Sequence, residues 1–301
     1  LYNVGGAQRE VVSFSLSKLF NDGDSSLTFG YTHQNIDMIC SMQSSTSHSN
    51  YGKCPASDFN NRVATRSIYE TEHRFFATLS STHYFFGADK PTTFNLFLER
   101  KSGLPGTLTF DTYSSPGRYK TQAFGYERRV NDDSAHLLYI PSGLDDPLVC
   151  WVSCSNPNNA VGSEILNLLY NTYGLERFKG RILPPGVFEF PWQTSLDLKI
   201  TQILPGFRDD DGFVVTLGIE NLLNLIDDEE GVIRYGDYTG KIDVFDFQLT
   251  SDYSKYIFGN SRGADYAFRY NPSNPYELRK SAVNSIWRAQ LGVTYKFSLS
   301  F

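Results

Sequence analysis

Long stretches in which apolar and polar residues alternate one by one are the strongest constraint on this chain. The pattern recurs in seven segments, which begin near Val12, Leu27, Phe75, Phe94, Leu196, Phe213 and Leu291. Successive side chains of a β-strand point to opposite faces of a sheet, so each segment predicts a strand with one apolar and one polar face. An aromatic share of 15% supports this, since Phe and Tyr favour pleated surfaces. We therefore predict an all-β fold.

The length of these segments favours a membrane barrel over a soluble sandwich. Most run to about ten residues or more, enough to cross a bilayer at a steep tilt, whereas strands of soluble domains average about five or six. Their polar face is built mainly of Ser, Thr and Gly, which suits a water-filled lumen. Aromatic residues collect near the strand ends, as in the girdles at a membrane interface. The candidate interface aromatics are Tyr84, Phe86, Trp192 and Trp287.

The connections between the predicted strands alternate between short and very long. The short ones cover Asn21–Asp24, Gly87–Pro91 and Leu204–Gly212, and the long ones about 37–71, 103–190 and 225–285. Outer-membrane barrels combine short periplasmic turns with long outer loops in this way. Such barrels have an even number of strands with both termini in the periplasm. Because seven is odd, we predict that residues 1–301 form the C-terminal part of a larger barrel.

The four cysteines form two local pairs, both in polar stretches of the long loops. Cys40 and Cys54 form one pair, and Cys150 and Cys154 form the other. Three pairings are possible, of which we favour the two local disulfides and hence an oxidising compartment. The alternative is four free thiols in a reducing cytosol. The spacings do not match a zinc pattern.

The remaining motifs predict no enzyme, no cofactor and no metal site. The segment Gly259–Gly263, "GNSRG", matches the nucleophile elbow G-x-S-x-G, but no His follows Ser261, so we interpret it as a turn. The five histidines, His48 in a loop among them, show no metal-ligand spacing, and the acidic turns "DDDG" and "DDEEG" lack the calcium-loop spacing. A net charge of −6 with interspersed signs argues against a nucleic-acid partner. "SEILNLLY", Ser163–Tyr170, predicts a short helix capped by Ser163.

Several segments resemble one known family. "VVSFSLSKLFNDGDSSLTFGYTHQNIDMI" looks like a barrel hairpin of TonB-dependent outer-membrane receptors of the Oar-like group, and so does "FPWQTSLDLKITQILPGF". "GIENLLNLID" and the terminal "WRAQLGVTYKF" are similar to the last barrel segments of the group, and "HLLYIP" to a stretch of its large outer loop. The resemblance implies a barrel of about 22 strands, preceded by a plug domain and a TonB-binding segment, both outside residues 1–301.

The resemblance also implies a function, a location and partners. We expect energised import of a ligand across the outer membrane of a Gram-negative bacterium, with TonB displacing the plug. The expected surroundings are outer-membrane lipid and lipopolysaccharide, the plug and the remaining barrel strands. A C-terminal aromatic is expected to be recognised by the assembly machinery, and the candidates are Tyr295, Phe297 and Phe301. One alternative is adhesion, surface assembly or export, in which the outer loops meet an extracellular protein partner. Another is a soluble, disulfide-bonded β-rich module.

Four charged residues fall on the polar face and are our candidates for lining the lumen. They are Glu99, Asp197, Lys199 and Glu220. One interpretation is that they hold the plug or contact cargo. The other is ordinary lumen packing with ion pairs between neighbouring strands.

Overall fold

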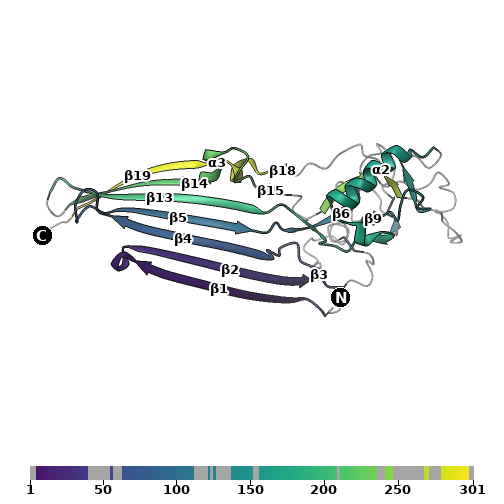
Figure 1. Cartoon of the computed structure of the whole chain (residues 1–301), viewed down its shortest axis with the longest axis horizontal. Coiled ribbons are helices and arrows are strands. Elements are labelled where there is room, and N and C mark those ends of the chain that lie inside the picture. Colours follow the sequence, from purple (N-terminus) through teal and green to yellow (C-terminus); the bar gives the residue numbers. More distant parts are fainter. Residues whose placement is uncertain are drawn as a thin grey trace.

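Seven long strands form one antiparallel sheet in chain order, which confirms the all-β prediction (Figure 1). The structure is a computed structural model that describes residues 5–39, 55–56, 63–111, 121–122, 125–126, 137–151, 156–208, 211–235, 241–246, 268–270 and 279–297. The long strands are β1 (Gln8–Phe20), β2 (Ser25–Met38), β4 (His73–His83), β5 (Thr92–Lys101), β13 (Gln193–Pro205), β14 (Gly212–Glu220) and β19 (Arg288–Lys296). The short β3 (Thr65–Arg66) also pairs with β2.

The connections lie at two opposite ends of the sheet. The three short ones are at the end where Figure 1 marks the C-terminus, which we call the turn end. The first of them is the 3₁₀ turn η1 (Asn21–Gly23), in which Asn21 and Asp22 have φ of 53° and 55°. Asn and Asp tolerate this left-handed region better than other residues with a side chain, so the sequence is suited to the reversal. The long connections are at the other end, the loop end.

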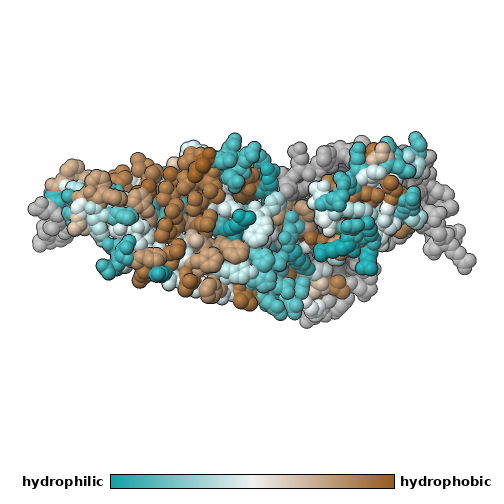
Figure 2. Space-filling view, in the orientation of Figure 1, coloured by the Kyte–Doolittle hydropathy of each residue, from teal (hydrophilic) through white to brown (hydrophobic). Residues whose placement is uncertain are grey.

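The register gives the sheet two unlike faces, as the alternation predicts. Cross-strand partners share a face, and one continuous apolar row runs through Leu27, Leu79, Leu96, Leu198 and Ile219. Figure 2 shows this apolar surface spreading over the sheet. The opposite face carries hydroxyl pairs, such as Ser17 with Thr28 at 2.9 Å. We call these the apolar face and the polar face.

The sheet stays open in the described part of the chain. There β1 pairs with β2 alone and β19 with β14 alone, so each edge strand has an unpaired side. Among the described residues, no helix is long and apolar enough to span a membrane.

A compact module made mostly from the second long connection stands at the loop end. We define the loop module as the described residues from 105 to 190. Its elements are β6 (Pro105–Asp111), β7 (Thr121–Gln122), β8 (Gly125–Tyr126), β9 (Tyr139–Ile140), β10 (Val149–Trp151), α2 (Asn159–Asn167), the π-helix η2 (Leu168–Thr172), the 3₁₀ turn η3 (Glu176–Phe178), β11 (Arg181–Ile182) and β12 (Phe188–Glu189). The last long connection contributes β16 (Lys241–Asp246), parallel to β6, and β17 (Phe268–Tyr270), parallel to β10.

The last long connection also carries two small helices beside the sheet. They are α3 (Leu222–Ile226) and α4 (Ala282–Ser285), with the strand pair β15 (Arg234–Tyr235) and β18 (Arg279–Lys280) between them. Asn221 joins them, because its side-chain nitrogen Nδ2 donates to the carbonyls of Gly231 (3.0 Å) and Ser285 (2.9 Å).

In the described part of the chain, the buried hydrophobic cluster lies in the loop module and not in the sheet. Its buried side chains are Leu108, Leu138, Tyr139, Ile140, Trp151, Ile165, Leu166, Leu169, Leu175, Leu183 and Phe190. Among the described residues, none of the seven long strands carries a buried hydrophobic side chain. On the apolar face, Leu16 is 63% exposed and Leu291 is 69% exposed. The described residues therefore leave the apolar face uncovered.

The predicted helix at Ser163 exists, but its predicted cap is wrong. The helix α2 begins at Asn159, and the side chain of Asn158 accepts from the Val161 amide at 3.3 Å. Ser163 lies inside the helix and donates to the Asn159 carbonyl at 3.0 Å. Asn caps a helix as well as Ser does, so the earlier cap adds a full turn.

Candidate functional site

The centre of the polar face is hollowed and forms the candidate binding site. The hollow has a volume of about 750 Å³ and spans β4, β5, β13, β14 and β19. Strand pairing places Lys199 opposite Gly218, and Gly218 opposite Gln290. Because Gly218 has no side chain, the space between Lys199 and Gln290 stays open.

Three of the four predicted lumen residues lie in this hollow: Asp197, Lys199 and Glu220. Asp197 accepts a hydrogen bond from the backbone N–H of Asn221 at 2.8 Å, which fixes one of its carboxylate oxygens. Glu220 lies 3.7 Å from Arg288, and both side chains are more than half exposed, so this ion pair is weak. Lys199 has no ion pair among the described residues. The hollow therefore presents an unpaired cation beside two carboxylates, which suits a polar or zwitterionic ligand.

Glu99 is the exception and lies outside the hollow, nearer the loop end. It is bridged by Arg74 at 2.6 Å and by Lys101 at 3.3 Å. Arg74 comes from the neighbouring strand β4. The geometry therefore favours an ordinary ion pair between strands as the role of Glu99.

The four candidate interface aromatics divide between the two ends of the sheet. At the loop end, Trp192 stacks on His73 with ring centroids 6.1 Å apart, and Arg100 lies 5.5 Å over its ring. Trp287 precedes β19 and is 42% exposed. At the turn end, Phe86 is exposed, and Tyr84 donates to the Asp24 carboxylate at 3.1 Å. That hydrogen bond, followed by the Coulomb interaction with Asp24, raises the pKa of Tyr84.

Two of the three candidate assembly-signal aromatics belong to a ring cluster at the turn end. Tyr295 lies 4.7 Å from Phe213 and 6.0 Å from Phe297, and its hydroxyl donates to Asp211. Phe297 is 62% exposed. Phe301 lies outside the described residues.

Other sequence predictions also fall on parts of the chain that are not described. Cys40, Cys54 and Cys154 lie outside the described residues, as do the "GNSRG" segment, His48 and His136. Cys150 lies on β10, but only its backbone is described. The two local disulfides stay predictions.

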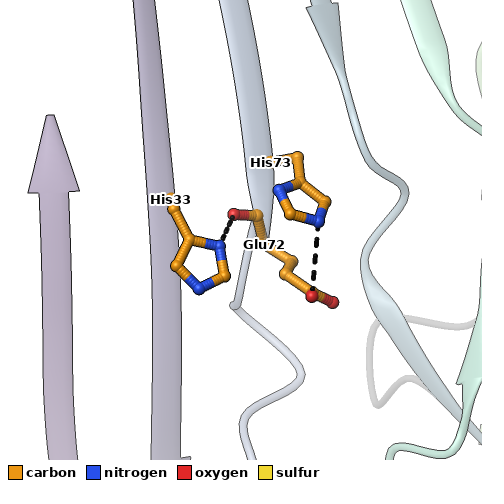
Figure 3. Close-up of side chains that lie close together, drawn as sticks. All are labelled: His33, Glu72 and His73. Atoms are coloured by element: carbon orange, nitrogen blue, oxygen red, sulfur yellow. Dashed lines mark hydrogen bonds and ion pairs between the residues drawn. The ribbon is translucent and has the colours of Figure 1, made fainter. Parts of the chain in front are cut away.

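One cluster was missed by sequence reasoning, which found no metal-ligand spacing. His33 on β2 faces His73 on β4 as a cross-strand partner, and Glu72 lies beside both (Figure 3). One ligand atom from each of the three lies within 4.8 Å of the others. The long connection between β2 and β4 separates the residues in sequence, so no short motif could have revealed the cluster.

The chain was compared with protein-family models, with curated proteins and with solved structures. None of the three comparisons finds a match.

Proposed function

We propose that the sheet is part of the wall of an outer-membrane β-barrel. The observation that carries the proposal is the uncovered apolar face. A soluble sandwich buries such a face against a second layer, yet the buried hydrophobic cluster of the described residues lies in the loop module. Lipid is the cover that suits a continuous apolar surface on strands of 9 to 14 residues. The opposite, polar face then lines a water-filled lumen.

The open edges of the sheet support a larger barrel. An unpaired strand edge leaves backbone N–H and C=O groups without partners, which is costly in hydrocarbon. We therefore infer that further strands pair with β1 and β19 and close the wall, in keeping with the resemblance to receptors of about 22 strands. The loop end, with its folded module, faces the cell exterior, and the turn end faces the periplasm.

Energised import is the transport function that this arrangement supports best. A plug inside the lumen would cover the hollow with Lys199, Asp197 and Glu220, and TonB would displace it to admit a ligand. The part given to TonB rests on the resemblance of the strand segments to TonB-dependent receptors.

The first experiment tests the membrane location. The full-length protein is expected to require detergent for extraction and to migrate differently on gels before and after heating, as folded outer-membrane barrels do. Extraction by salt or alkali, with no heat-dependent shift, would favour the soluble, disulfide-bonded module.

The second experiment tests import. A strain that lacks this protein and a strain that lacks TonB are grown in the same medium, and the compounds left in the spent medium are compared. We expect at least one small compound to remain in both cultures. A protein without a role in import leaves the medium depleted as in the parent strain.

The loop module favours adhesion or surface assembly as a second candidate function. Loops that only bind a small ligand need no hydrophobic core, yet this module has one around Trp151 and Leu138. Specific capture of a purified surface protein by the full-length protein, lost when the module is deleted and independent of TonB, would favour this alternative.

A further inference from the structure

We propose that His33, Glu72 and His73 bind a divalent metal ion of the zinc class, which ties β2 to the start of β4. Two imidazoles and one carboxylate form a ligand set typical of zinc sites that keep a fourth position for water. The proposal rests on described side chains alone and is independent of where the sheet lies.

The geometry of the three groups is close to that of a metal site. Ligand atoms bound to one zinc ion at about 2.0–2.1 Å stand about 3.3 Å apart. Nε2 of His73 is already 3.4 Å from Oε1 of Glu72. The two imidazole rings lie 5.2 Å apart between centroids. Bringing the three ligand atoms from within 4.8 Å of one another to about 3.3 Å would close the site.

Each imidazole is oriented by a hydrogen bond at its Nδ1 atom, which leaves Nε2 for the metal. Nδ1 of His33 is 3.1 Å from the Glu72 carbonyl oxygen, which can only accept, so this nitrogen carries the proton (Figure 3). The lone pair of His33 is then on Nε2, which has no partner among the described residues. Nδ1 of His73 is 2.9 Å from the Tyr31 hydroxyl, which can accept its proton and leave the Nε2 lone pair for the ion. Partners of this kind are usual around metal-bound histidines.

The charge around the cluster also favours a cation. Arg66 contacts the carboxylates of Glu70 at 2.5 Å, Glu72 at 2.6 Å and Glu189 at 2.8 Å. Three carboxylates against one guanidinium leave an excess of two negative charges, which a divalent ion offsets. Arg66 holds Oε2 of Glu72, so Oε1 remains on the side of His73.

Metal binding can be measured directly on the full-length protein, purified in detergent without a polyhistidine tag. We expect titration with ZnCl2 to give one equivalent bound. His33→Gln and His73→Gln should each weaken binding at least about 100-fold, since even outer-shell changes cost about 10–100-fold. His83→Gln is the matched control, because His83 lies at the opposite end of β4, where it contacts Ser81. It should bind zinc as the parent protein does.

Two further variants keep the test decisive if a histidine variant does not fold. Glu72→Gln preserves size and hydrogen bonding to Arg66 but should lower zinc affinity about 100-fold. Tyr31→Phe removes only the partner of His73 Nδ1 and should lower it about 10-fold. With Cu²⁺ in place of zinc, paramagnetic resonance should report two imidazole nitrogens. No bound zinc in the parent protein, or equal affinity in the His33, His73 and Glu72 variants, would overturn the proposal.

Discussion

At the residue scale, one arginine links the segment before β4 to the loop module. Arg66, on β3, contacts Glu70 and Glu72 before β4 and Glu189 in the loop module. Glu70 is almost fully buried and also accepts the Ile36 amide of β2 at 2.5 Å. Burial opposes the charge of Arg66, but the hydrogen bonds to Glu70 and Glu189 outweigh it and raise its pKa.

Replacing this arginine should loosen the junction. In Arg66→Met, the carboxylate of Glu70 stays buried without a cation, which costs about 3 kcal/mol. Hydrogen exchange of the Ile36 amide should become about 100-fold faster as the local opening free energy falls. Arg181→Met is the control, because Arg181 is exposed and has no ion pair among the described residues. Equal exchange in the two variants would show that the Arg66 contacts carry no stability.

A second prediction at this scale concerns acid. Burial opposes ionisation of Asp146, but amides of Ser142 (2.6 Å) and Leu148 (2.9 Å), with the hydroxyls of Ser142 and Tyr139, outweigh it and lower its pKa. A carboxyl whose folded pKa is below its ordinary 3.8 stabilises the fold above that pH. This contribution is lost as the pH falls through the lower, folded pKa.

The acid prediction is tested with Asp146→Asn. At pH 7 this variant should lose about 2 kcal/mol of loop-module stability, because hydrogen bonds to a charged group are lost. The difference from the parent protein should shrink as the pH falls below about 4. Chemical unfolding followed through Trp151 fluorescence, in a background with Trp192→Phe and Trp287→Phe, measures both. The neighbouring, exposed Asp145→Asn should track the parent at every pH, and the same gap for Asp146→Asn at pH 2 and pH 7 would contradict the prediction.

At the element scale, the helix α2 packs on the loop-module core through a glycine. A Cβ atom at Gly162 would lie 2.7 Å from the Trp151 ring, which is 1% exposed. The indole nitrogen donates to the Leu144 carbonyl at 2.8 Å, so the ring is held in place. The close approach of helix and ring therefore needs glycine at this position.

Gly162→Ala should destabilise the loop module although alanine favours helices. Overpacking against Trp151 costs about 1–3 kcal/mol, against about 1 kcal/mol gained in helix propensity. Unfolding should be followed through Trp151 fluorescence in a background with Trp192→Phe and Trp287→Phe. Ser163→Ala, on the exposed side of α2, should be neutral or slightly stabilising. A more stable Gly162→Ala variant would mean that the ring moves freely.

At the scale of the whole molecule, the two faces of the sheet should respond oppositely to charge. Leu198 lies mid-strand on the apolar face, and Thr78 lines the hollow of the polar face. If lipid covers the apolar face, Leu198→Arg costs about 2–4 kcal/mol and Thr78→Arg costs little. The amount of heat-modifiable protein in outer-membrane fractions should fall for Leu198→Arg alone. Equal yields of the two variants, or better solubility of Leu198→Arg, would contradict a lipid-facing surface.

The strands, their two faces and the short turns could be predicted from the local pattern of residues. Alternation is a local property, because every second side chain of an extended backbone points the same way whatever the strand pairs with. Hence the face of Asp197, Lys199 and Glu220 could be assigned before any pairing was known. The turn at Asn21 and Asp22 is equally local.

Contacts between distant residues, in contrast, depend on how the strands and loops pack together. The pairing of β2 with β4 brings His33 to His73, and the folding of the second long connection brings Glu189 to Arg66. The pairing of β4 with β5 explains why Glu99 is separate from the other three predicted charges, because it places Arg74 beside Glu99. The formation of the loop-module core around Trp151 also depends on tertiary packing. Its side chains come from short elements without a strong period, and they become a core only when those elements pack together.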